Sequence, residues 1–227
     1  MNDLTTTSHA FDSYLCADYG LTIYIGNEVQ RIPSCLLYGR KNVISIVFEE
    51  DSNCKSIGEF AFRACELVEE IIIPEGVISI ENNAFLECDN LKYISLPNSL
   101  ESIGGTGLNQ CEFLVYNEYN NGLYLGNEEN PYLILIKVKL TSENELITHE
   151  KTKFIHTLCI MDSMTINKVY ISKNVKFIAI NAFISNLLEE IVFEDTNNWY
   201  CNGEIIQTDI FIDKYVCLNY IIQYNFL

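Results

Sequence analysis

The sequence predicts an α/β solenoid, in which short parallel strands line one face and short helical or 3₁₀ turns lie opposite. Two observations predict this fold. Cys65, Cys88 and Cys111 are spaced 23 and 23 residues apart, and a fixed period of about 20 to 50 residues is the signature of a repeat architecture. Residues 57–74 and 80–97 also align without a gap, with Ile, Ala, Phe, Cys and Pro recurring in the same slots.

Composition supports a packed, acidic protein. Of the 227 residues, 48% are hydrophobic and 20% are charged, which is enough apolar material for a core. The 14 Lys and Arg residues against 31 Asp and Glu residues give a net charge of −17, which repels phosphate backbones and anionic headgroups. The longest apolar run, residues 132–136, is far shorter than the roughly 20 residues of a membrane span. We therefore expect neither nucleic acid nor membrane insertion.

Each copy of the repeat predicts the same local structure. In Leu91-x-x-Ile94-x-Leu96 the apolar residues alternate, which predicts a short strand with one side inward, and Pro97 ends it because it has no N–H to donate. Residues 82–86 have room for about one helical or 3₁₀ turn, with a phenylalanine that plugs the core. One copy cannot bury its own apolar edge, whereas stacked copies can.

The predicted organisation is a single solenoid domain over residues 1–227. The recurring Phe slot is interrupted once, between Leu108 and Ile160, and the stretch there reads as two strands joined by a turn-rich loop. Apolar spacing over 208–223 predicts a helix near the C-terminus. In order, we expect an N-terminal cap (1–20), repeats (21–116), a hairpin-like insert (117–145), repeats (146–198) and a C-terminal cap with that helix (199–227).

At these repeats the chain resembles the BspA-like class of leucine-rich repeats, whose consensus is close to Leu-x-x-Ile-x-Leu-Pro-x-x-Val-x-x-Ile-Gly-x-x-Ala-Phe-x-x-Cys. The resemblance covers roughly residues 21–200. It implies a right-handed leucine-rich-repeat solenoid with parallel strands on its concave face. It also implies a surface or secreted protein that adheres to host or neighbouring cells. Several copies in this chain lack the Gly, Phe or Cys of the consensus.

No motif predicts catalysis, a metal or a cofactor. Gly104 occupies the Ile-Gly slot of the repeat, so the glycine-rich stretch that follows it is not read as a phosphate loop. His156 and Cys159 could form a nucleophile pair, but no third partner is identifiable and Cys159 falls in an inward Ala slot. The acidic runs do not follow a calcium-loop spacing, and the cysteines at the period of 23 are expected to be small buried hydrophobes.

The outward positions of the strands are the predicted binding site, because repeat solenoids commonly bind through the strand surface. They combine apolar and aromatic residues with acidic flanks, which is typical of protein recognition. The predicted partner-binding residues are Tyr24, Val47, Glu70, Ile72, Tyr93, Ser95, Tyr170, Glu190 and Val192.

Two functions are the main alternatives at this point, with an enzyme or regulatory domain as a third. The first is a non-enzymatic surface or secreted module that binds a protein or glycan in adhesion. The second is an intracellular protein–protein interaction scaffold of the same fold, which the absence of a recognisable signal peptide in residues 1–10 would suit. The identity of the ligand and the oligomeric state do not follow from the sequence.

Overall fold

The structure is a computed structural model of the whole chain. It describes residues 20–104, 108, 111–179, 181–195, 199–201, 204–205 and 222–224. The chain divides into two compact units, residues 1–115 (unit 1) and 116–227 (unit 2), and each is described by itself. The predicted N-terminal cap therefore lies outside the described residues except for Gly20.

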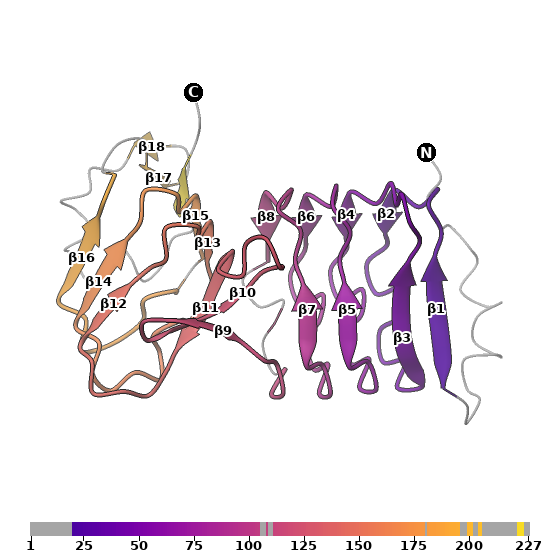
Figure 1. Cartoon of the computed structure of the whole chain (residues 1–227), viewed down its shortest axis with the longest axis horizontal. Coiled ribbons are helices and arrows are strands. Elements are labelled where there is room, and N and C mark those ends of the chain that lie inside the picture. The colour runs from indigo at the N-terminus through magenta and orange to yellow at the C-terminus, as the bar shows by residue number, and fades with distance from the viewer. Residues whose placement is uncertain are drawn as a thin grey trace. The chain divides into compact units, whose positions relative to one another are not determined.

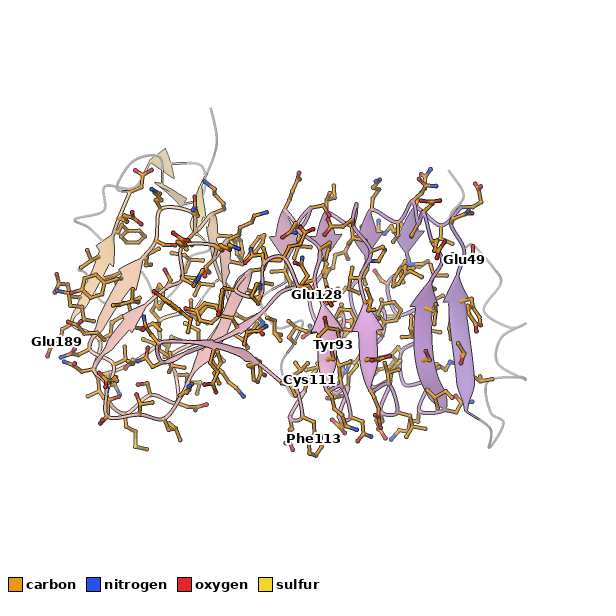
Figure 2. All side chains as sticks on the ribbon, in the orientation of Figure 1. Glu49, Tyr93, Cys111, Phe113, Glu128 and Glu189 are labelled. Carbon is orange, nitrogen blue, oxygen red and sulfur yellow. The ribbon has the colours of Figure 1, made fainter. Side chains whose placement is uncertain are left out.

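Unit 1 consists of two columns of short parallel strands (Figure 1). In the first column β1 pairs with β3 and β5 pairs with β7, and Figure 2 shows Tyr93 on the last of these strands. In the second column β2, β4, β6 and β8 form a continuous parallel ladder. The first column contains β1 (Leu21–Ile25), β3 (Val43–Phe48), β5 (Glu70–Ile72) and β7 (Tyr93–Ser95), and the second contains β2 (Arg31–Ile32), β4 (Ser56–Ile57), β6 (Ser79–Ile80) and β8 (Ser102–Ile103).

Unit 2 repeats the two parallel columns and adds antiparallel strands. One parallel ladder contains β12 (Glu145–Ile147), β14 (Lys168–Ile171) and β16 (Glu190–Phe193). The other contains β11 (Ile134–Val138), β13 (Phe154–Ile155) and β15 (Phe177–Ile178). The antiparallel strands are β9 (Asn117–Tyr119) and β10 (Gly122–Leu125) beside β11, and β17 (Trp199–Cys201), β18 (Glu204–Ile205) and β19 (Ile222–Tyr224) beside β15.

Antiparallel pairing thus occupies the segment in which the sequence predicts a hairpin-like insert, and β11 then leads into a parallel ladder with β13. The division of the whole chain into one solenoid domain with caps and an insert stays a prediction. Most of the helix expected over 208–223 lies outside the described residues. Its last two positions, Ile222 and Gln223, belong to strand β19 instead.

The predicted solenoid of parallel strands is confirmed, with about seven turns, whereas the α/β class is not. No helix occurs in the described part of the chain. The segment 82–86, expected to form a helical or 3₁₀ turn, lies in a run of turn residues over 82–87, and equivalent runs occupy 34–39 and 59–64 (together the turn segments of unit 1). The architecture is therefore a β-solenoid.

Hydrogen bonding between coils explains why these turn segments are not helical. In residues 60–65 alternate N–H groups donate to the next coil: Phe60 to Asn82 O (3.2 Å) and Phe62 to Ala84 O (2.9 Å). The intervening N–H groups bond locally, as Arg63 does to Phe60 O (3.2 Å). A helix needs every successive N–H to bond within its own segment. Phe60 also has a left-handed φ of 56°, which interrupts a right-handed helix.

The core of unit 1 is a stack of equivalent residues from successive coils. Phe62 and Phe85 are 0% and 2% exposed, and their ring centroids lie 5.5 Å apart in a tilted contact. Leu37 and Leu108 occupy the same slot in the flanking coils and are also buried. The predicted Phe slot is thus at the centre of the core, where the rings of Phe62 and Phe85 pack on one another between successive coils.

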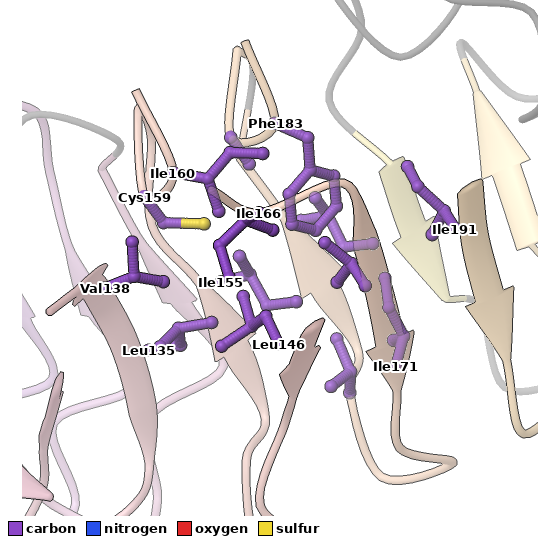
Figure 3. Close-up of a cluster of buried hydrophobic side chains, with 14 of the residues drawn as sticks. Leu135, Val138, Leu146, Ile155, Cys159, Ile160, Ile166, Ile171, Phe183 and Ile191 are labelled. Atoms are coloured by element: carbon purple, nitrogen blue, oxygen red, sulfur yellow. The ribbon is translucent and has the colours of Figure 1, made fainter. Parts of the chain in front are cut away.

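Unit 2 has its own hydrophobic core, shown in Figure 3. Ile160 and Phe183, which continue the Phe slot, lie in it together with inward residues of β12 and β14 such as Leu146 and Val169. Leu135 of β11 joins the same cluster, so the strand that follows the antiparallel pair contributes to the core of the repeats.

Steric contact between coils explains why glycine occupies the Ile-Gly slot. A Cβ placed on Gly58 would lie 2.5 Å from the backbone N of Ser34 in the preceding coil, and one on Gly104 would lie 2.4 Å from the N of Asn82. Coils approach each other too closely here for a side chain in that direction. The glycine that resembles the start of a phosphate loop therefore serves coil packing.

We predict that Phe85→Ala lowers the free energy of unfolding by about 3–5 kcal/mol, because it leaves a cavity between two stacked coils. Chemical denaturation followed by circular dichroism measures the change. Phe113→Ala is the matched control, since the Phe113 side chain is 58% exposed, and it should change the free energy by less than about 0.5 kcal/mol. Equal effects of the two substitutions would show that the Phe slot is not the packing centre.

Candidate functional site

The candidate site is the outward side of the first strand column in each unit, which we call the strand face. In unit 1 it is formed by β1, β3, β5 and β7, and in unit 2 by β12, β14 and β16 (Figure 1). Parallel pairing places equivalent side chains of successive coils next to one another at a spacing of about 4.8 Å. Each strand contributes two outward positions, so each unit presents two rows of side chains.

In unit 1 the rows differ in polarity. The first row holds Thr22 paired with Ser45, and Glu70 paired with Tyr93. The first three of these residues are polar, and the last is aromatic. The second row holds Tyr24 paired with Val47, and Ile72 paired with Ser95. This row is apolar over three successive strands.

None of the nine predicted binding residues is buried. Tyr24 and Ile72 are 68% and 63% exposed, and Tyr93 and Val47 are 42% and 38% exposed. The two glutamates are also exposed, and the other three residues are half-buried: Ser95, Tyr170 and Val192. The inward neighbours Ile25, Ile46, Ile71 and Ile94 are all buried, so the strands alternate in the phase that the sequence predicts.

In unit 2 the first row of the strand face is charged. Glu145, Lys168 and Glu190 are register partners on β12, β14 and β16, and Lys168 Nζ lies 2.8 Å from Glu190 Oε2. The ammonium also lies 4.9 Å from the centroid of the Tyr170 ring. Hydrogen bonding to Glu190 and Tyr170 raises the pKa of Lys168 above its ordinary value.

The second row in unit 2 is Ile147, Tyr170 and Val192, again in register across three strands. Sequence reasoning missed Ile147, which is 43% exposed, because β12 begins at the last residue of the predicted insert and no strand was expected there. The period of 23 gives the signal that could have found it, since Leu146 precedes Val169 by 23 residues. The structure also shows a hollow beside this row that no sequence motif indicates.

The cysteines at the period of 23 lie on the turn side of unit 1, away from the strand face. Each thiol donates to the backbone carbonyl of the Phe slot in the preceding coil: Cys65 to Leu37 O (3.5 Å), Cys88 to Phe62 O (3.2 Å) and Cys111 to Phe85 O (3.2 Å). All three are buried free thiols. The slot therefore selects a small apolar residue that can also donate one weak hydrogen bond.

Comparison with known families agrees with this repeat geometry. A family model described as the BspA type leucine rich repeat region matches residues 8–127 in six copies, which is more than half of the 227 residues. The chain belongs to the BspA-type leucine-rich repeat family. In unit 2 the coils of β12, β14 and β16 continue beyond the matched residues. No match is found among curated protein sequences.

Solved structures of related proteins are also similar to this BspA-type chain. The pneumococcal vaccine antigen PcpA is 18% identical, with 77% of this chain and 51% of that chain covered and a TM-score of 0.41. A leucine-rich repeat protein from Bacteroides ovatus is 23% identical, with 77% and 49% covered and a TM-score of 0.45. A leucine rich cell surface protein from Faecalibacterium prausnitzii is 20% identical, with 76% and 60% covered and a TM-score of 0.35. The chain spans about half the length of the first two.

The antiparallel segment of this BspA-type chain holds an aromatic cluster. The His149 ring stacks on Tyr132 with centroids 4.0 Å apart and meets Tyr119 edge-on at 4.6 Å. The backbone N–H of His149 donates to the hydroxyl of buried Tyr124 (3.3 Å), and the N–H of Lys151 donates to His149 Nδ1 (3.0 Å). These contacts tie β9 and β10 to the loop that follows β12, so the cluster packs the antiparallel strands against the repeats.

His156 and Cys159, which were considered above as a possible nucleophile pair, are both buried inside unit 2. Burial lowers the pKa of His156 to about 4, and its Nδ1 lies 3.1 Å from the carbonyl oxygen of Thr157. Burial also raises the pKa of Cys159, which disfavours the reactive thiolate. Both side chains are therefore built into the core in their neutral forms.

Metal ligation and membrane spanning find no support in the described ranges. No group of three or more His, Cys, Asp or Glu side chains is gathered there as a metal site. Nor does the described part of the chain contain a helix with the length and apolar character to cross a bilayer.

We predict that iodoacetamide alkylates Cys35 in the native protein much faster than Cys65, Cys88, Cys111 or Cys159. Cys35 is exposed, whereas burial raises the pKa of the others, to about 12 for Cys65 and Cys111, and blocks access. Peptide mass spectrometry assigns the label to each site. In denaturant the five rates should converge, and native labelling of Cys88 as fast as Cys35 would contradict the buried thiol slot.

His156 should make stability depend on pH. Its pKa is about 4 in the folded chain and about 6.5 when unfolded, so the unfolded chain binds the proton more tightly. The contribution of His156, about 3 kcal/mol, is fully present above pH 6.5 and is lost as the pH falls from about 6.5 to about 4.

The measurement is the free energy of unfolding of wild type and His156→Gln at pH 7 and pH 4. When the pH falls from 7 to 4, the free energy of unfolding should decrease by about 3 kcal/mol less in the variant than in the wild type. The matched control is His149→Gln, because His149 is only half-buried and should give a smaller difference. The same loss in wild type and His156→Gln would mean that His156 is not buried as the neutral imidazole.

Proposed function

We propose that this chain is a non-enzymatic BspA-type binding module that recognises a protein partner through its strand face. One observation carries the proposal: the second outward row is apolar in successive coils of both units. Tyr24 and Ile72 in unit 1 are more than 60% exposed, and Ile147 in unit 2 is 43% exposed. Apolar side chains gathered on one exposed face, rather than scattered singly, mark interaction surfaces.

The charged residues around the apolar row favour a protein over a glycan as the partner. In unit 1 the apolar row lies beside Glu70, which is exposed, and the exposed ion pair of Glu69 with Lys92 (2.9 Å) directly precedes β5 and β7. An apolar and aromatic centre with a charged rim is the usual anatomy of a protein interface. The parallel ladder also fixes the backbone of these strands before binding, which lowers the entropy lost on association.

Membership of the BspA-type family supports a location at the cell surface or outside the cell, where the module would act in adhesion. Extracellular location predicts that protease treatment of intact cells removes the protein. Protection in intact cells together with release on lysis would overturn this part of the proposal.

A second candidate is an intracellular scaffold of the same fold. The observation that favours it is that Cys35, Cys54, Cys65, Cys88, Cys111 and Cys159 are free thiols, as expected in a reducing compartment. Protease treatment of intact cells separates the two candidates, since only the scaffold would be protected.

The test of the binding surface is a double variant, Ile72→Ser with Tyr93→Ala. Both side chains are exposed, so the free energy of unfolding should change by less than about 0.5 kcal/mol. Partner affinity should fall by about tenfold or more, because aromatic and apolar anchors carry most of the binding energy. Proteins captured from a surface extract by the wild-type chain are identified, purified and titrated against both chains by calorimetry.

Tyr38→Ala is the matched control, because Tyr38 is a 50% exposed tyrosine in a turn segment. It should leave partner affinity unchanged. Equal affinity of wild type and double variant for every partner would rule out the unit 1 strand face. Binding to glycans alone would show that the partner is not a protein.

A further inference from the structure

The strand face of unit 2 contains a hollow at the ends of β12, β14 and β16. Its volume is about 370 Å³, and it is lined mostly by apolar atoms. The lining includes Ile147, Tyr170 and Val192, which are the three register partners of the apolar row. One outward position of three adjacent strands thus forms a wall of this hollow.

The size and lining of the hollow leave room for a bulky apolar side chain. Ligand sites of about 300–1,000 Å³ with mostly apolar walls and few polar groups are typical of small-molecule recognition. At 370 Å³ the hollow is near the small end of that range. A pocket on an otherwise open face is also where an interface places its anchor residue.

The hydroxyl groups in the lining already have partners in the protein. Thr148 Oγ1 accepts a hydrogen bond from the N–H of Ser172 (2.8 Å), and Ser172 Oγ donates to the carbonyl of His149 (3.1 Å). Polar recognition of a ligand therefore depends mainly on the one charged residue of the lining, Glu194.

Glu194 places a carboxylate group at the hollow. Its Oε2 accepts a hydrogen bond from the backbone N–H of Lys173 (3.0 Å), and its Oε1 lies 4.0 Å from Lys173 Nζ. The two side chains are 55% and 64% exposed, so solvent weakens the pairing. A ligand cation can compete for this carboxylate, whereas a ligand anion is repelled, and the chain's net charge of −17 adds to that preference.

We propose that this hollow binds a bulky apolar side chain of a peptide segment that also carries lysine or arginine beside it. The apolar side chain packs against Ile147, Tyr170 and Val192, and the neighbouring cation interacts with Glu194. This inference rests on the proposed function, since it makes the hollow the anchor pocket of the unit 2 strand face.

The test uses three tripeptides on the full chain: acetyl-Lys-Phe-Lys-amide, acetyl-Glu-Phe-Glu-amide and acetyl-Lys-Gly-Lys-amide. Titrations are followed by amide chemical shifts in NMR. The first peptide should bind about tenfold more tightly than either of the others, because it alone combines apolar burial with favourable charge. The shifts should be centred on β12, β14 and β16, and added salt should reduce its advantage over the glutamate peptide.

Two variants connect the binding to the hollow. Val192→Phe fills the space without changing charge and should abolish binding of the Lys-Phe-Lys peptide. Glu194→Gln keeps an oxygen for the N–H of Lys173 and should remove the preference for Lys-Phe-Lys over Glu-Phe-Glu. Val115→Phe is the matched control, since Val115 is an exposed valine outside the strands of the strand face, and it should leave binding unchanged.

Several outcomes would overturn the inference. They are equal binding of the three peptides, unchanged binding by Val192→Phe, and equally tight binding of phenethylamine, which would make the ligand a small amine rather than a peptide. Absence of tripeptide binding while Ile72→Ser with Tyr93→Ala still weakens a protein partner would reject the pocket and leave the proposed function. Tripeptide binding in the hollow with no effect of that double variant would instead reject recognition through the unit 1 face.

Discussion

Hydrogen bonding between successive coils is the constraint on which the rest of this structure depends. In unit 1 the strands of the second column are only two residues long, so a single coil makes too few bonds to hold its shape. The turn segments add to these ladders because alternate N–H groups, such as those of Phe60 and Phe62, donate to the next coil. Left-handed residues such as Phe60 and Leu158 cost roughly 1–2 kcal/mol each, and the bonds between coils offset this cost.

The same constraint explains which residues recur. Gly58 and Gly104 lie where the backbone of the preceding coil leaves no room for a Cβ. Cys88 is small enough for a slot packed between coils, and its thiol reaches the carbonyl of Phe62. Phe85 fills the space at the centre of the stack. Each slot is defined by a neighbour about 23 residues away, which is why the period is visible in the sequence.

Stacking also leaves the outward positions of the strands free to vary. Inward positions are committed to the core and the turn segments to bonding between coils, so the outward positions of the strands are the least constrained. In unit 1 they expose an apolar row that includes Tyr24 and Ile72. In unit 2 they combine the charged row around Lys168 with an apolar row and a hollow that contains Glu194. The two units thus offer surfaces of different chemistry on the same scaffold.

The sequence by itself determined the period, the alternation of inward and outward residues and the identity of the core slots, because these depend on residue size and polarity along one coil. Tyr93 could be assigned outward and Ile94 inward from the pattern alone. Only the tertiary structure decided that the described turn segments are not helical, since the local sequence of residues 82–86 allows a helical turn. It also decided that β12 brings Ile147 beside Tyr170 and that a hollow forms there. The reason is that hydrogen-bond partners and cavity walls come from neighbouring coils, whose register only the assembled stack defines.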